Sequence, residues 1–220
     1  MALREACTVF QGCVEDGHID QISLDETVGV TVLGLTKSMR YDYIAPGCVS
    51  QTVRRAMSLP SDVRDVWIEL YLRWSLNFTT QNVNGCATPP NHKLLFGYVV
   101  PDLSGRWSLM WGQQGHLGVE GEWPRAGWAE VAPSGAVYWD GNWHRVRLHW
   151  KFSSTASATD GVYQLWIDEP IVYDNRSLTT TEGNAIHWLV LGANLDQGIP
   201  AGTMSLWWGR IRVWNEDPGW

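Results

Sequence analysis

VWIELYLRWSLNF, residues 66–78, is the stretch of the chain that decides the fold class. Every second side chain from Val66 to Phe78 is apolar, whereas Glu69 and Arg73 are among the side chains between them. Side chains of a β-strand alternate between its two faces, so this period of two predicts a half-buried strand. A helix would scatter the same apolar residues around its circumference.

A second stretch, DGNWHRVRLHWKF at residues 140–152, alternates in the same way. From Trp143 onward one face is largely apolar and the opposite face is basic. The basic face carries Arg145, Arg147, His149 and Lys151. This basic ribbon stands out because the formal net charge of the whole chain is −7.

Shorter strand signals separated by turn residues follow along the chain, and residues 51–58 are also compatible with a helix. Many short strands with frequent turns are typical of a sandwich or barrel. We expect one domain over residues 1–220, with residues 1–20 as an extended N-terminal arm. The strands are expected at 28–35, 50–58, 66–78, 93–100, 106–112, 115–120, 136–139, 143–152, 161–168, 171–174, 185–194 and 203–214.

Composition narrows the possible partners. An excess of acidic residues argues against nonspecific nucleic-acid binding, which needs a basic surface. No apolar run reaches the roughly 18 residues of a membrane span. The 15 Trp residues outnumber the 4 Phe and 7 Tyr, and such a surplus predicts that several Trp rings are exposed for binding. The crowding of Trp207, Trp208, Trp214 and Trp220 predicts a contact surface for another subunit.

The four cysteines are Cys7, Cys13, Cys48 and Cys86. In a strand over residues 7–13, Cys7 and Cys13 would lie about 20 Å apart, too far to bridge each other. The spacing resembles no zinc motif. We therefore expect reduced structural thiols.

Residues 141–175, GNWHRVRLHWKFSSTASATDGVYQLWIDEPIVYDN, resemble the concanavalin-A-like jelly-roll superfamily, in its polysaccharide-lyase-like and laminin-G-like branch. The resemblance lies in a Gly-x-Trp-His entry, an alternating strand, a polar loop and the hairpin segment DGVYQLWID. It implies an all-β, two-sheet antiparallel β-sandwich with the concanavalin-A-like jelly-roll topology. The segments that also fit are SMRYDYIAPG (38–47), WIELYLRW (67–74), HKLLFGY (92–98) and WWGRIRVWN (207–215).

In this architecture the outer face of one sheet often forms a glycan groove. The resemblance implies that the strands at 66–78, 143–152 and 161–168 belong to that sheet and that their polar sides form a binding surface. Aromatic rings there would stack on sugar faces, and arginine forks would bind carboxylates or sulfates. A plain solvated polar face is the alternative, with Glu69 paired to a neighbouring arginine. The candidate ligand-binding residues are Trp67, Glu69, Tyr71, Arg73, Arg145, Arg147, His149, Lys151, Gln164 and Trp166. The expected core residues are Leu70, Leu72, Val146, Leu148, Tyr163, Leu165 and Ile167.

The resemblance does not extend to catalytic signatures. The chain has no Gln-Ile-His strand, no Tyr-x-Lys-x-Gly-x-Tyr segment and no paired-glutamate strand. We therefore expect a non-catalytic binding or structural sandwich. With no secretory signal in the first residues, the expected place is a virion surface, as a capsid decoration protein, or the extracellular space if a signal was removed. The expected partners are an acidic or neutral glycan and capsid or other particle proteins, in an oligomer or larger assembly without nucleic acid or membrane.

Two alternatives concern the same surface. One is a lectin-like carbohydrate-binding module. The other is a lyase that cleaves a uronate polymer by β-elimination, which needs a group that neutralises the carboxylate, a base and an acid. Arg73 or Arg147 would fill the first role, and His149 or Tyr71 the others. A glycosidase is disfavoured, because Glu69 is the one carboxylate placed on this face and hydrolysis needs two.

No cofactor is expected, and calcium is the one metal considered. Calcium takes oxygen ligands, which the two ends of the chain would supply if they pair. The candidate ligands are Asp16, Asp20, Asn215, Glu216 and Asp217.

Overall fold

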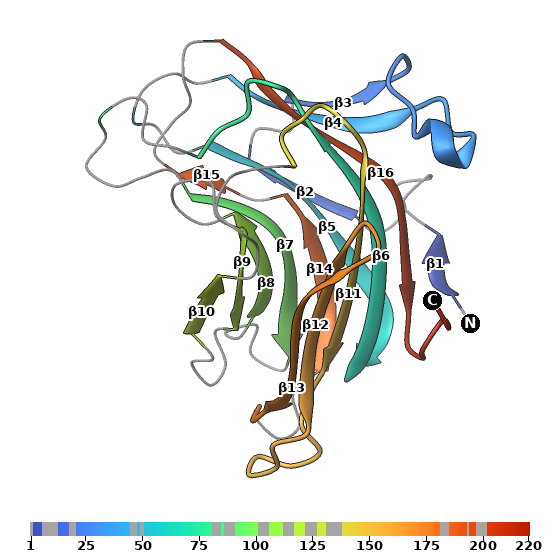
Figure 1. Ribbon diagram of the computed structural model, residues 1–220, viewed down its shortest axis with the longest axis vertical. Helices are drawn as coiled ribbons and strands as arrows, with labels where there is room; N and C mark the ends of the chain where they lie inside the picture. The colour runs from blue at the N-terminus through green and yellow to red at the C-terminus, as the bar shows by residue number, and fades with distance from the viewer. Residues whose placement is uncertain are drawn as a thin grey trace.

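A computed structural model describes residues 2–5, 13–17, 21–44, 48, 51–80, 85, 91–100, 106–111, 117–121, 127–130, 138–180, 185–192, 194–196 and 202–220. The strands in these ranges form two antiparallel sheets that pack face to face (Figure 1). The expected all-β sandwich is therefore confirmed. No helix in these ranges is long and apolar enough to cross a membrane.

Sheet A contains the strands that carry the alternating stretches. Its strand order is β13-β12-β11-β6-β16-β4-β3. β1 pairs with the C-terminal part of β16, beyond the part that pairs with β4. The strands are β1 (Ala2–Glu5), β3 (Ile22–Asp25), β4 (Ser38–Tyr43), β6 (Asp65–Trp74), β11 (His144–Lys151), β12 (Gly161–Ile167), β13 (Ile171–Leu178) and β16 (Met204–Trp214).

Sheet B covers the inner face of sheet A. Its strand order is β10-β9-β8-β7-β14-β5-β15, and β2 also pairs with β5. The strands are β2 (Cys13–Gly17), β5 (Gln51–Val63), β7 (Asn91–Val100), β8 (Arg106–Trp111), β9 (Leu117–Gly121), β10 (Gly127–Glu130), β14 (Ala185–Leu191) and β15 (Asn194–Asp196). Residues 51–58, which were compatible with a helix, thus lie in a strand.

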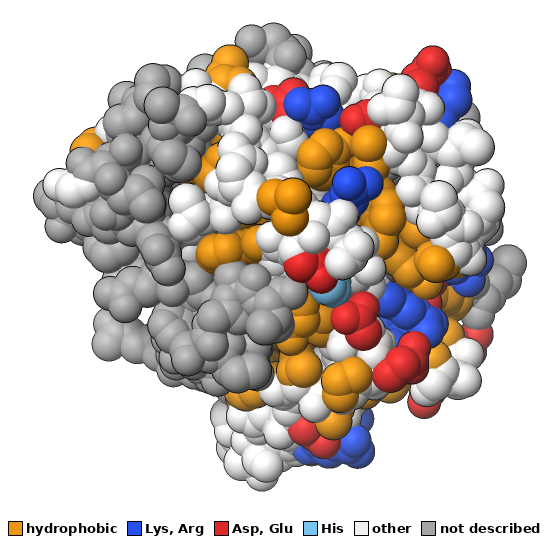
Figure 2. Space-filling view, turned by 45° about the horizontal axis from the view of Figure 1, so that its top comes forward, with side chains coloured by type: hydrophobic (Ala, Val, Ile, Leu, Met, Phe, Trp, Pro, Cys, Tyr) orange, Lys and Arg blue, Asp and Glu red, His pale blue; other side chains and the backbone are white. Residues whose placement is uncertain are grey.

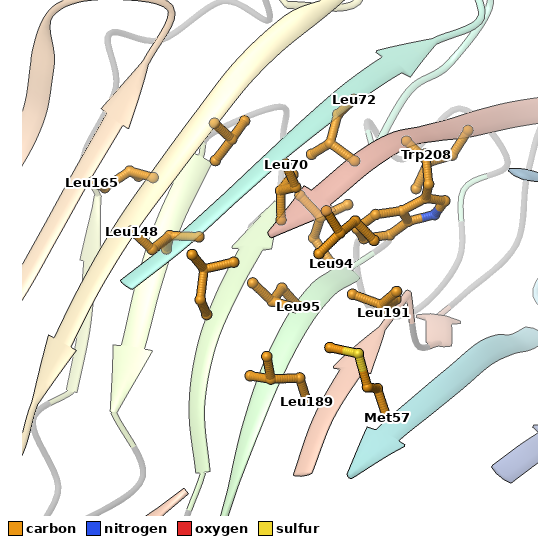
Figure 3. Packing of buried hydrophobic residues seen from close by; sticks show 14 of the residues in the cluster. Met57, Leu70, Leu72, Leu94, Leu95, Leu148, Leu165, Leu189, Leu191 and Trp208 are labelled. Carbon is orange, nitrogen blue, oxygen red and sulfur yellow. The ribbon is translucent and has the colours of Figure 1, made fainter. Parts of the chain in front are cut away.

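The hydrophobic core fills the space between the two sheets. Figure 3 shows Leu70 and Leu148 of sheet A pointing toward Leu95 and Leu189 of sheet B. The expected core residues Leu70, Leu72, Val146, Leu148, Tyr163, Leu165 and Ile167 are all buried. The period-two pattern therefore identified the inner face of sheet A correctly.

The predicted strand at 28–35 is wrong. This segment forms a loop with a short 3-10 turn, η2 (Thr31–Leu33), and the strand follows at 38–43 as β4. The two ends of the loop meet, because a Cβ on Gly29 would lie 2.0 Å from the Leu35 carbonyl oxygen. An extended strand cannot bring residues six positions apart into contact, so the loop needs a glycine at this point.

Other strand ends differ from the expected ones. β6 ends at Trp74, and the Phe78 N–H then donates to the Ser75 carbonyl oxygen at 2.9 Å in a turn. The turn breaks the alternation, so Phe78 is buried whereas Leu76 is 78% exposed. β10 was not expected, and of the expected strand 136–139 the described residues 138 and 139 are not in a strand.

The first twenty residues contain two described segments, β1 and β2. β1 pairs with β16, with Ala2 opposite Trp214, and β2 pairs with β5. The single domain and the N-terminal arm over 1–20 remain predictions. Cys48 is disulfide-bonded, so the expectation of reduced thiols is wrong at this position.

Candidate functional site

Apart from Arg73, the predicted binding residues come together on the outer face of sheet A, the face turned away from the core. β12, β11 and β6 are neighbours, and Arg147 lies opposite Trp166 on one side and Glu69 on the other. His149 lies in the same way between Gln164 and Trp67. The remaining predicted residues, Tyr71, Arg73, Arg145 and Lys151, follow at alternate positions of β6 and β11.

The centre of this face is a carboxylate held by two arginines. The Glu69 side chain is 3% exposed. Its Oε2 accepts bonds from Arg145 Nε at 2.9 Å and Nη2 at 2.5 Å, and its Oε1 accepts one from Arg210 Nη2 at 3.3 Å. Partial burial lowers the pKa of Arg145, but the hydrogen bonds and charge of Glu69 outweigh it, and the net pKa is raised. This part of the basic face is therefore an internally paired network.

Arg147 is the buried cation of this face, with 5% of its surface exposed. Its Nη2 donates to the backbone carbonyl oxygens of Asp168 at 3.1 Å and Glu169 at 3.4 Å. Glu169 Oε2 also lies 3.4 Å from this nitrogen, but that side chain is 80% exposed. Burial and then the charge of Arg145 lower the pKa of Arg147. Among the described residues Glu169 is the one carboxylate that forms an ion pair with this guanidinium, and the charges of Glu169 and Glu69 act against the lowering of its pKa.

His149 is held on both edges and one face. Its ring stacks on Trp67 with centroids 3.7 Å apart and planes 8° apart. Its Nδ1 lies 2.9 Å from Gln164 Oε1 and its Nε2 lies 2.8 Å from Asp65 Oδ1. Both nitrogens therefore have polar partners within the protein, and the histidine is fixed in orientation.

Four tryptophans form an outer aromatic cluster: Trp67, Trp166, Trp214 and Trp220. The Trp67 and Trp166 rings are 6.3 Å apart and 24° from parallel. Trp220 meets Trp67 edge to face at 5.6 Å and Trp214 at 5.2 Å. The Arg147 guanidinium lies over both Trp166 and Trp220, at 5.9 and 5.7 Å from the ring centroids. The cluster therefore surrounds the buried cation with aromatic rings.

The side chains that β16 and the residues after it place on this outer face were not predicted from the sequence. Strict alternation would place Arg210 and Arg212 on the face of the buried Trp208. A bulge between Trp208 and Ile211 shifts the phase, so that Arg210, Arg212 and Trp214 lie on the outer face. The crowded tryptophans, expected at a subunit contact, divide into a core residue, Trp208, and residues on this face.

Arg73 lies at the other end of β6, apart from Arg147. It lies six positions along the strand from Trp67, which corresponds to about 20 Å. Its guanidinium lies 5.3 Å from the Trp207 ring, which Arg40 also approaches at 5.4 Å. The Trp207 indole donates to Asp25 Oδ2 at 2.9 Å. Burial works to raise the pKa of Asp25, but this bond and those from Thr27 and Val28 lower it to about 2.

The motif residues shared with the jelly-roll superfamily bind one another at the end of the β12–β13 hairpin. His144 Nδ1 lies 3.0 Å from Asp168 Oδ2, and His144 Nε2 lies 3.1 Å from Asp140 Oδ1. Asp168 adopts a left-handed φ of 58° at the tip, which Asp tolerates better than most residues. The Trp143 indole donates to the Gly29 carbonyl oxygen at 2.9 Å. These residues therefore hold the hairpin and the 26–37 loop.

In the space-filling view of Figure 2, basic, acidic and hydrophobic side chains lie interleaved on the face in view. The described part of the chain holds no group of three or more His, Cys, Asp or Glu side chains suited to a metal ion. Of the proposed calcium ligands, Asp20 lies outside the described residues, and calcium binding remains a prediction.

Comparisons with known proteins agree on the fold. No family model matches the chain, and no curated protein matches its sequence. The structure is similar to an endo-β-1,4-glucuronan lyase from the fungus Trichoderma reesei, with a TM-score of 0.63 and 16% identity over 97% of this chain and 94% of that one. It is also similar to the alginate lyase vAL-1 from Chlorella virus, with a TM-score of 0.58 and 8% identity over 88% and 93% of the two chains.

A third similar structure belongs to botulinum neurotoxin type C, described as dependent on two ganglioside molecules for cell entry. Its TM-score is 0.57 and its identity 11%, over 93% of this chain and 43% of that one. At these identities the likeness concerns the fold. The fold is the concanavalin-A-like jelly roll shared by polysaccharide lyases, and the resemblance seen in the sequence is thereby confirmed.

Proposed function

We propose that this protein binds an acidic glycan on the outer face of sheet A and does not cleave it. The observation that carries the proposal is the cation Arg147 on β11, which lies over the Trp166 ring of β12 on one side and has Trp67 of β6 nearby on the other. A uronate residue offers a flat apolar face to an indole ring and a carboxylate to a guanidinium, so this pairing of groups matches its chemistry.

The charge of the face supports an acidic ligand. Arg145, Arg147, Arg210 and Arg212 lie on it, and the buried Glu69 and the exposed Glu169 neutralise part of their charge. The remaining positive charge is local, because the chain as a whole is acidic. Such a local excess favours a polyanion held along the sheet over general binding to any anionic surface.

A uronate lyase is the second candidate, favoured by the likeness to the glucuronan lyase fold. The groups first considered for elimination are engaged in other contacts. Both nitrogens of His149 have protein partners. Tyr71 is 8% exposed, and the Arg210 guanidinium lies 6.0 Å from its ring. These contacts favour binding over proton transfer.

Isothermal titration with glucuronan, alginate and heparin oligosaccharides, and with a neutral glucan, tests the proposal. We expect heat of binding with at least one acidic chain and weaker binding to the neutral one. Trp166→Ala should lower the affinity about tenfold, the loss expected from one stacked ring. Lys93→Ala removes a cation from β7 in sheet B and should leave the affinity unchanged. Equal binding of neutral and acidic chains would contradict the proposal.

Incubation with the same oligosaccharides distinguishes a lyase from a protein that only binds them. β-Elimination creates unsaturated chain ends that absorb in the ultraviolet, and we expect flat absorbance traces over the whole panel. A rising trace that is lost in His149→Gln would replace the binding proposal with the lyase.

A location on the surface of a virion, with capsid or other particle proteins as partners, is the finer part of the proposal. The disulfide at Cys48 supports an oxidising surrounding. The similar alginate lyase from Chlorella virus supports the use of this fold by a virus. Size-exclusion light scattering should show a symmetric oligomer or attachment to a shell. A strict monomer that binds a glycan would favour the lectin-like module instead.

A further inference from the structure

The six residues after β16 turn back over the outer face of sheet A. Figure 1 shows the chain reversing beyond the end of β16 before it reaches the C mark. The reversal is encoded locally, because Asp217 Oδ1 accepts the Gly219 N–H at 2.8 Å and Gly219 has a φ of 72°. Proline followed by a glycine at positive φ is the signature of a type II turn. The turn directs Trp220 back onto the sheet.

Trp220 covers Arg147. Its ring packs edge to face on Trp67 and Trp214 at 5.6 and 5.2 Å, and its centroid is 5.7 Å from the Arg147 guanidinium. The indole Nε1 is buried and makes no hydrogen bond within the described part of the chain. The contact is therefore made by the ring face and edges alone. No hydrogen bond from the described residues fixes the indole in place.

The cation–π contact of Trp220 stands where a buried carboxylate would otherwise neutralise Arg147. Arg147 is 5% exposed, and its carboxylate neighbour, Glu169, is 80% exposed at the surface. A cation–π contact compensates a buried guanidinium less well than a well-placed carboxylate with charge-assisted hydrogen bonds does. An anionic group that reached Arg147 would therefore displace the ring at a net gain.

We propose that residues 215–220 form a strap that closes the Arg147 site through Trp220 and that an acidic glycan opens it. This inference rests on the proposed function and adds its regulation. Asp217 and Gly219 are exposed, so the strap swings away without unpacking the core. Trp220 packs edge to face against Trp67 and lies over Arg147, and the incoming uronate takes its place beside that ring and on that cation.

The first test needs no glycan. An arginine-selective dicarbonyl reagent, followed by peptide mass mapping, measures the accessibility of Arg147 in the wild-type protein and in Trp220→Ala. We expect Arg147 to be protected in the wild type and modified several-fold faster in the variant. Arg145, whose side chain is 28% exposed, is the internal reference and should react equally in both proteins. Unchanged protection of Arg147 in the variant would overturn the strap.

Two further variants show whether Arg147 becomes accessible because the Trp220 ring no longer covers it or because the protein unfolds. Trp220→Phe keeps an aromatic ring and should restore most of the protection. Gly219→Val keeps the tryptophan but strains the turn, because the left-handed φ of 72° disfavours a β-branched residue. We expect Gly219→Val to expose Arg147 as Trp220→Ala does. The proposal would be contradicted if the protection of Arg147 depended neither on an aromatic ring at position 220 nor on the turn at Gly219.

The second test is glycan affinity. An acidic oligosaccharide that must displace the ring should bind Trp220→Ala about five- to tenfold more tightly than the wild type, the factor equivalent to one cation–π contact. Weaker binding by the variant would make Trp220 part of the binding platform and overturn the strap. Absence of binding by both proteins would overturn the proposed function and the glycan as the opening ligand. The dicarbonyl experiment would still decide whether Trp220 covers Arg147.

Discussion

The two faces of sheet A are built from the same strands and are buried to a similar degree, yet they are buried by different means. Leu70 and Leu148 on the inner face are 0% exposed, and Glu69 and Arg147 at adjacent positions on the outer face are 3% and 5% exposed. Sheet B covers the inner face, whereas neighbouring side chains, the 26–37 loop and Trp220 cover the outer one. Burial alone therefore does not distinguish the core from the polar outer face. The chemistry of the contacts does.

The largest difference should appear when a side chain is removed from the inner face. Leu148→Ala opens a cavity between the sheets, and we expect the free energy of unfolding to fall by about 3 kcal/mol. Denaturant unfolding followed by tryptophan fluorescence measures it. Leu76→Ala, at a position 78% exposed, should change stability by less than about 0.5 kcal/mol. Equal losses in both variants would contradict the assigned faces.

A buried charge on the outer face should cost nearly as much to remove. Glu69→Gln keeps the shape of the side chain but leaves Arg145 and Arg210 without their shared carboxylate. We expect a loss of about 2 to 3 kcal/mol, below that of a fully buried pair because water reaches both arginines. Glu169→Gln is the matched control, and its exposed ion pairs should contribute little. A stable Glu69→Gln protein would show that the network is not needed for folding.

The core between the two sheets also contains a titratable group, His92 of sheet B, and it should make stability depend on pH. His92 hydrogen-bonds the Tyr43 hydroxyl at 2.7 Å, and burial lowers the pKa of His92 from 6.5 to about 3. Between these values the unfolded chain binds a proton that the folded chain does not. The free energy of unfolding should therefore fall as the pH drops below about 6.5, with about 2 kcal/mol lost by about pH 5.

The histidine's contribution is isolated by comparison with His92→Gln. Denaturant unfolding of both proteins at about pH 7 and about pH 5 should show a smaller loss in the variant, which has no imidazole to protonate. Parallel losses in the two proteins would assign the acid sensitivity to other groups, the outer-face carboxylates included.

The smallest effect is expected where the 26–37 loop meets the outer face. Trp143→Phe removes the indole N–H that donates to the Gly29 carbonyl oxygen at 2.9 Å. We expect a loss of about 1 kcal/mol, the net contribution of one hydrogen bond. Hydrogen exchange of the loop amides should accelerate, whereas exchange in β6 should not change. Accelerated exchange in β6 as well would show that the loop supports the sheet itself.

Local patterning predicted which side chains of each strand lie on the inner face of sheet A and which lie on its outer face. Period-two alternation is a property of neighbouring residues, so Leu70 and Arg147 were placed on their correct faces without knowledge of the fold. The jelly-roll resemblance supplied the pairing of β6, β11 and β12.

What covers the outer face could not be predicted in this way, because the contacts join distant parts of the chain. Nothing in the alternation of 66–78 indicates that Trp220 lies on Trp67. The phase shift at the β16 bulge hid Arg210, since alternation assumes an unbroken ladder. The apolar residues at 28–35 resemble a strand, and the close approach at Gly29 that folds them into a loop involves backbone atoms six residues away.

The outer aromatic cluster also gives this molecule an optical signature. Trp67 and Trp166 lie 6.3 Å apart at 24°, and Trp220 stands nearly perpendicular to Trp67 at 72°. Indoles this close couple their excited states, and the rotational strength of the coupled bands depends on their mutual angles. Far- and near-ultraviolet circular dichroism will therefore record any rearrangement of these rings without a label.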